Sequence, residues 1–133
     1  MAGNISDYLE NKILEHVMGK TTYTKPTATY LALYLVTPTD STAGTEVANA
    51  NGYVRQAITW GTASNGTISN SAQITFPAAT GSPWGTVTAL GVVDASVWGS
   101  GNILWYGPVS PNVTIAVADI YQISVGGLQL TLD

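Results

Sequence analysis

The sequence predicts an all-β protein: an antiparallel β-sandwich or jelly roll of about eight strands, with one short N-terminal α-helix. Two observations carry this prediction. Apolar residues recur at every fourth position only near the N-terminus, and after Pro26 they alternate at every second position. The alternating segments are short, follow at roughly 8–12-residue spacing and are separated by turn-forming residues. With no linker or long repeat, residues 1–133 are expected to form a single domain, with the helix at about 5–18 and the sandwich at about 28–133.

One apolar face with four-residue spacing predicts the helix. Its members are Ile5, Leu9, Ile13 and Val17. Asn4 or Ser6 can cap the first turn, and Gly19 is a natural end. Because a lone sandwich does not cover such a face in an evident way, we expect these four residues to dock on another protein.

The strands follow from a change of period. Residues 29–36, TYLALYLV, are apolar on both faces, so we expect a central strand that is covered on both sides. A polar loop over 37–52 follows, and Asn65-Gly66 is the strongest hairpin signal because both residues accept the positive φ of a tight turn. The other strands are expected at 53–60, 73–76, 85–95, 102–107, 112–117, 120–125 and 128–133.

Two of these strands carry specific expectations about their faces. Over 53–60, Val54, Ile58 and Trp60 fall on one side and Arg55 and Thr59 on the other. Over 112–117, the alternation places Val113, Ile115 and Val117 inside.

Charge is scarce and unevenly placed. Only 9% of the residues are charged, against roughly 25% in average soluble proteins, and the net charge is -4. The four cations, Lys12, Lys20, Lys25 and Arg55, all lie in the N-terminal part, so the chain lacks a basic stripe for phosphate or an anionic membrane. No apolar run reaches the ~20 residues of a membrane span, and the N-terminus does not resemble a signal peptide. We therefore expect no nucleic-acid partner, no membrane partner and synthesis in a cytoplasm.

Hydroxyl and amide side chains supply most of the polarity. The stretch ITWGTASNGTISNSAQITFP, residues 58–77, contains no charged residue. Such a surface stays wet, yet it can pack against another protein without desolvating ions, which would cost several kcal/mol each. This composition suits a chain that works inside an assembly.

Candidate catalytic and metal-binding residues are few. The chain has one histidine, His16, and no cysteine, which leaves too few ligands for a typical zinc site. A serine triad would need His16 as its base, and no G-x-S-x-G elbow surrounds any serine. We therefore expect no enzymatic activity, no metal and no cofactor.

The four tryptophans, Trp60, Trp84, Trp98 and Trp105, allow two interpretations. The favoured one is that they fill strand ends in the core or form subunit contacts, where large amphipathic rings contribute most. The alternative is that exposed indoles on sandwich loops stack on sugar rings, which would make the chain a glycan-binding module.

A resemblance to a known family adds to this reading. The segments GTEV…GYVRQA, SNSAQITFP and WGTVTALGVVDA, together with YLENKILEHVMG, TYLALYLVTPTD, NILWYGPV and the terminal GGLQLTLD, occur in this order along nearly the whole chain. They resemble a family of small proteins of tailed bacteriophages, the phage tail fibre proteins. The resemblance implies a structural protein on the outside of the virion, with no catalytic residues to carry over.

The position on the virion is left with alternatives. Because 133 residues leave no room for a fibre shaft, we favour a capsid decoration (cement) protein, which we expect to form a trimer at a symmetry axis. The first alternative is a tail-fibre or tail-associated adaptor protein, and a more distant one is a module that binds host glycans. Expected partners are the major capsid protein or tail and fibre proteins, together with further copies of the chain. Synthesis would take place in the cytoplasm of the bacterial host.

Overall fold

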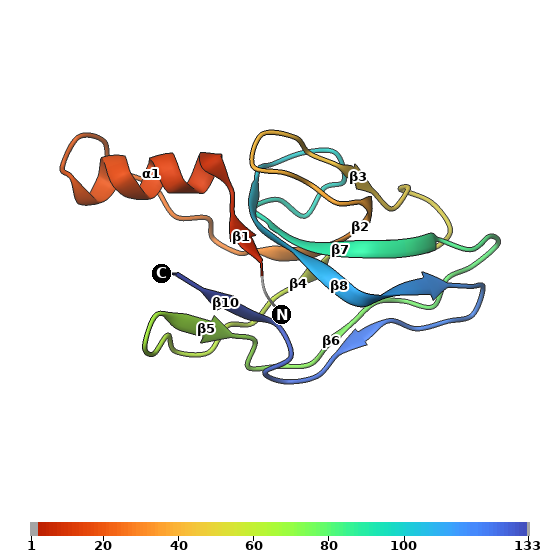
Figure 1. The fold of residues 1–133 in the computed structure, drawn as a ribbon. Helices are drawn as coiled ribbons and strands as arrows, with labels where there is room; N and C mark the ends of the chain where they lie inside the picture. The colour runs from red at the N-terminus through yellow and green to blue at the C-terminus, as the bar shows by residue number, and fades with distance from the viewer. Residues whose placement is uncertain (1–2, 133) are drawn as a thin grey trace.

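The computed structural model describes residues 3–132, and within them it contains one helix and ten strands (Figure 1). The elements are β1 (Asn4–Ile5), α1 (Asp7–Val17), β2 (Tyr30–Val36), β3 (Thr45–Glu46), β4 (Gln56–Ala57), β5 (Thr67–Ser69), β6 (Ile74–Thr75), β7 (Gly85–Val93), β8 (Ile103–Ile115), β9 (Gln122–Ile123) and β10 (Gln129–Thr131). The predicted all-β class with one short N-terminal helix is confirmed. The strands outnumber the eight or so predicted because five of them are only two residues long. Asp133, the last residue of the strand predicted at 128–133, lies outside the described residues.

All strand pairs are antiparallel. The large sheet has the order β1-β8-β7-β2-β3, with β4 also pairing with β2, and two small sheets pair β10 with β5 and β6 with β9. Figure 1 shows the two small sheets below the long strands β7 and β8, with α1 projecting at one end of the molecule. The sheets therefore form two layers.

The main core lies between these layers. Leu31 and Leu33 of β2, with Phe76 and Leu128 from the other layer, are fully buried. Ala32 and Tyr34 of β2 point to the opposite face, where they are buried in a second, smaller cluster. The prediction that residues 29–36 form a central strand covered on both faces is confirmed.

The predicted strands at 102–107 and 112–117 form one strand, β8. Pro108 is paired with Ala89 and Val113 with Val87, so residues 109–112 face a single residue of β7, Thr88, as an irregularity in the ladder. Both predicted segments pair with the same neighbour, and the Gly-Pro break between them is absorbed without ending the strand. Val117 lies beyond the end of β8 and is 47% exposed, so its predicted burial is wrong.

The helix begins two residues later than predicted. The Ser6 N–H donates to the Leu104 carbonyl at 3.0 Å, and Ser6 Oγ accepts from the Leu9 N–H at 3.3 Å, which caps the first turn. Residues before Ser6 continue instead as β1, where Ile5 pairs with Trp105 of β8. Ile5 is therefore not a helix residue, because its backbone pairs with β8 at the edge of the large sheet.

The Asn65-Gly66 hairpin is present as predicted. Asn65 has φ 50° and Gly66 has φ 72°, and the flanking Ser64 and Thr67 exchange two backbone hydrogen bonds of 2.9 and 3.0 Å. The strand that leaves this turn, β5, pairs with β10 near the C-terminus. A local signal thus fixed the turn, whereas a distant segment supplied the strand's partner.

Candidate functional site

An apolar groove runs between the N-terminal segment and the small sheet of β5 and β10. It has a volume of about 300 Å³. Its apolar side chains include Ile5, Leu9, Ile13, Ile68, Trp105 and Leu130. The hairpin at Asn65-Gly66 contributes Gly66 to the wall. The structure therefore brings together three of the four residues predicted for docking, and adds one of the four tryptophans.

The helix is covered only in part. None of its residues is buried, although a surface helix of a globular protein usually turns its apolar stripe into the core. Leu9 packs against the core from a half-buried position, and Ile13 is also half-buried at the groove. Val17 is 66% exposed and does not line the groove, so it is separated from the other predicted docking residues. Leu14 is 59% exposed on the same helix.

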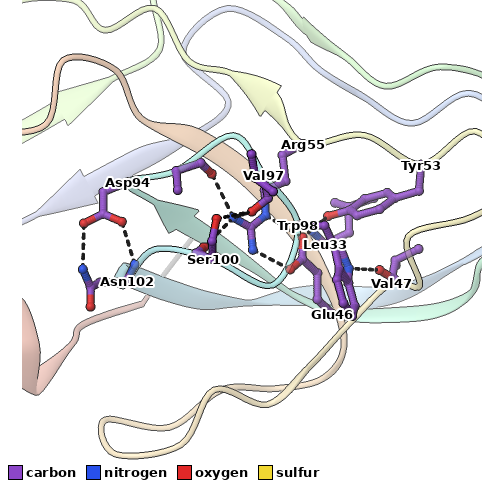
Figure 2. A network of polar contacts seen from close by, with 11 residues as sticks. Leu33, Glu46, Val47, Tyr53, Arg55, Asp94, Val97, Trp98, Ser100 and Asn102 are labelled. Carbon is purple, nitrogen blue, oxygen red and sulfur yellow. Dashed lines mark hydrogen bonds and ion pairs between the residues drawn. The ribbon is translucent and has the colours of Figure 1, made fainter.

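A buried ion pair forms the second feature (Figure 2). Arg55 Nε and Nη2 donate to the two carboxylate oxygens of Glu46, each at 2.8 Å, and the side chains are only 4% and 8% exposed. The Tyr53 hydroxyl also donates to Glu46 at 2.8 Å and accepts from the Leu33 N–H at 3.0 Å. The Glu46 hydrogen bonds raise the pKa of Arg55, and burial followed by the Glu46 charge raises the pKa of Tyr53.

This ion pair fastens the loop between β7 and β8. Arg55 Nη1 donates to the carbonyl oxygens of Ala95, Val97 and Ser100 at 2.8–2.9 Å. Asp94 closes the base of the loop by accepting hydrogen bonds from the backbone and side chain of Asn102, as Figure 2 shows. We call these contacts of Arg55 with Glu46 and with the loop carbonyls the arginine clamp.

The arginine clamp corrects the prediction for residues 53–60. Only Gln56–Ala57 form a strand there, Arg55 is buried and Val54 is 56% exposed. Hydropathy alone predicts that Val54 is buried and Arg55 is exposed, and the structure shows the reverse. Arg55 can be buried because Glu46 and the loop carbonyls accept its hydrogen bonds. No local sequence pattern predicts the burial of Arg55; the only indication is that charged residues are rare in the chain.

The tryptophans occupy different environments. Trp84 and Trp105 are 5% and 4% exposed, so neither offers an indole face to solvent. Trp84 donates to the Asn51 carbonyl at 2.8 Å, and half-buried Trp60 donates to Thr29 Oγ1 at 2.8 Å. Trp98 is 43% exposed, and its N–H donates to the Val47 carbonyl at 2.8 Å. Core packing thus accounts for two of the rings, and Trp98 is the most open of the four.

His16, the one histidine of the chain, does not line the apolar groove. His16 is exposed in the last turn of α1, where its Nδ1 accepts from the Tyr23 N–H at 3.1 Å. Across residues 3–132, no three His, Cys, Asp or Glu side chains gather in a way that could hold a metal ion. The same part of the chain contains no helix with the length and apolarity needed to cross a bilayer.

Comparison with known proteins places the chain in a family. The family described as Podophage GP4 fiber I protein gp80 matches residues 4–131. The chain belongs to this family, which confirms the resemblance to phage tail fibre proteins seen in the sequence motifs. A fibre family identifies a structural protein of the virion exterior that contacts other phage structural proteins, and it points to a non-enzymatic role. Among curated proteins, none shows significant similarity to the chain.

Proposed function

We propose that the chain is a non-enzymatic component of the phage tail fibre or of its attachment to the particle. It docks on another virion protein through the apolar groove under α1. The observation that carries the docking proposal is the groove itself, where Ile5, Leu9 and Ile13 meet Trp105 without being fully covered. The family description supports the fibre position in preference to the capsid decoration favoured by chain length alone.

The size of the chain is compatible with this position. A fibre shaft needs repeats, which the 133 residues lack, but an adaptor that joins a fibre to its neighbours needs only a rigid body and a docking surface. The two-layered β-structure supplies the rigid body. The half-covered helix supplies the apolar docking surface. When a partner removes this surface from water, the complex is stabilised by about 25 cal/mol for each Å² buried.

A pair of matched helix variants tests the docking surface. Ile13→Asp places a charge in the groove, and Leu14→Asp places the same charge on the next residue, which is 59% exposed and does not line the groove. Purified variants are added to particles that lack the chain, and the bound copies are counted after sedimentation. We expect Ile13→Asp to lose binding and Leu14→Asp to retain it, with the same thermal unfolding temperature for both.

Leu9→Asp is a second groove variant, and it can also destabilise the fold. Because Leu9 packs against the core, this change tests whether the helix is a docking element or a part of the core. A folded Leu9→Asp chain that fails to assemble supports docking. Unfolding of both groove variants would assign the helix to the core and refute the proposal, as would normal assembly of a folded Ile13→Asp chain.

Counting on separated heads and tails decides between the fibre and the capsid. Wild-type chain that binds tails in a few copies and does not bind heads supports the fibre position. Saturation of heads at a number set by capsid symmetry would establish the decoration protein instead. Binding to neither heads nor tails would refute both the fibre position and the capsid position.

We also propose that the chain forms a closed homo-oligomer, and that this oligomer is a trimer. Closed cyclic symmetry is the usual solution for soluble oligomers, and the partly covered helix offers a surface for it. Light scattering after size exclusion would give a mass near three times 13.9 kDa for a trimer. A mass of 13.9 kDa at every concentration would exclude self-association in solution.

A further inference from the structure

A second pocket lies beside the arginine clamp, and it shares no lining residue with the groove. It has a volume of about 260 Å³ and is formed by residues of β2, β3 and the loop between β7 and β8. Its polar lining includes Tyr34, Glu46 and Arg55, and its aromatic wall is Trp98. Gly99 lies on its rim, where an added Cβ would meet no atom within 4 Å.

The hydroxyl of Tyr34 has no protein partner among the described residues. Tyr34 is only 3% exposed, and its ring lies over Gly91, where an added Cβ would approach the ring to 2.6 Å. Every fully buried side-chain nitrogen and oxygen atom of the described residues has a hydrogen-bond partner. The Tyr34 hydroxyl is therefore not fully buried, and Tyr34 lines this pocket. A hydroxyl held in this way can donate to and accept from a ligand.

Trp98 gives the pocket an oriented aromatic surface. Its indole N–H is bound by the Val47 carbonyl at 2.8 Å, so the ring is held in one orientation while 43% of the residue stays exposed. The loop that carries it is fastened by Arg55, as Figure 2 shows. Such preorganisation lowers the entropic cost of binding, because the site does not have to become ordered when a ligand binds.

The charges of the pocket favour a neutral ligand. Glu46 and Arg55 neutralise each other in a bidentate pair, so neither an anion nor a cation gains a full counter-charge. Glu46 Oε2 accepts one side-chain hydrogen bond within the described residues, which leaves it capacity for a further donor. The volume lies just below the roughly 300–1,000 Å³ of pockets for drug-sized ligands, so the occupant is small.

We propose that this pocket binds one neutral sugar ring. The apolar C–H face of the ring lies on Trp98, and its hydroxyl groups bond to the Tyr34 hydroxyl and to Glu46. Sugar rings combine an apolar face with closely spaced donors and acceptors, which matches one aromatic wall and two polar groups. The proposal concerns a binding site separate from the docking groove, so it can fail while the proposed virion role stands.

The four indole N–H groups allow a direct test. The full ¹⁵N-labelled chain is titrated with D-glucose, D-galactose, D-mannose and N-acetyl-D-glucosamine, and the indole signals are followed by NMR. We expect a saturable shift of the Trp98 signal with at least one sugar, while the signals of buried Trp84 and Trp105 stay in place. Trp98→Phe assigns the signal.

Hydroxyl-deletion variants locate the sugar in the pocket. Tyr34→Phe removes one hydrogen bond to the ligand and should weaken binding roughly fivefold without lowering thermal stability. Tyr30→Phe is the matched control, since Tyr30 lies on the same strand and does not line the pocket. A Trp98 signal that does not move with any of the four sugars would overturn the proposal. So would a shift that never saturates, or equal affinity in wild type and Tyr34→Phe.

Discussion

Removal of the Arg55 guanidinium is expected to cost a large part of the protein's stability. In Arg55→Met the apolar stem is kept, but two 2.8 Å hydrogen bonds to Glu46 and three to loop carbonyls are lost. Breaking a buried pair by deleting one partner typically costs about 3–5 kcal/mol, because the other charge stays buried without compensation. With both side chains less than a tenth exposed, solvent screens little of this loss. The total stability of a domain is only about 5–15 kcal/mol.

A double variant separates the contribution of the ion pair from that of the loop contacts. Arg55→Met/Glu46→Leu removes the uncompensated charge, so we expect it to recover roughly half of the loss seen in Arg55→Met. The loss that remains reports the carbonyl oxygens of Ala95, Val97 and Ser100, which must then find water. Free energies of unfolding come from urea titrations followed by tryptophan fluorescence and circular dichroism.

Two results would refute this reasoning. An Arg55→Met chain within about 1 kcal/mol of the wild type would show that the clamp contributes little to folding. A double variant less stable than Arg55→Met would show that the buried Glu46 charge is not the source of the loss.

Two further predictions concern other buried polar groups. Asn70, 1% exposed, donates to the Ser124 carbonyl and accepts from the Leu128 N–H, both at 2.9 Å. Asn70→Ala should therefore lower the unfolding free energy by roughly 3 kcal/mol in a urea titration, and a loss below about 1 kcal/mol would contradict this. Burial raises the pKa of Tyr34 and Tyr53 above the ordinary value of 10.0, so their stabilising contribution is complete below about pH 10 and is lost as the pH rises further. Unfolding free energies measured from about pH 9 to about pH 11 should fall, and Tyr53→Phe should fall less steeply.

Much of the fold could be predicted from the sequence because its signals are local. The apolar residues of 29–36 predicted a central strand. The backbone preferences of Asn65 and Gly66 predicted the hairpin turn that precedes β5. The four-residue spacing of Leu9 and Ile13 predicted a helix with one apolar face, and both residues line the groove. Each signal depends on residues that are neighbours along the chain.

The candidate sites depended more on distant contacts. Ile5 follows the helical spacing, but β8 pairs with its backbone and moves it into β1. The four tryptophans cannot be told apart by residue type. In the structure, buried Trp105 lines the groove, whereas exposed Trp98 lines the second pocket. No sequence pattern predicts that the Tyr34 hydroxyl is without a hydrogen-bond partner among residues 3–132.

The sequence by itself determined the β class, the place of the helix and the central strand. Only the tertiary structure decided that Arg55 is buried, that the segments around Pro108 form one strand, and which tryptophan remains open. The physical reason is that periodicity reports the face of a local element, whereas burial of a charge requires partners from elsewhere. Arg55 finds Glu46 nine residues away and the loop carbonyls 40–45 residues away, and those contacts exist only in the folded chain.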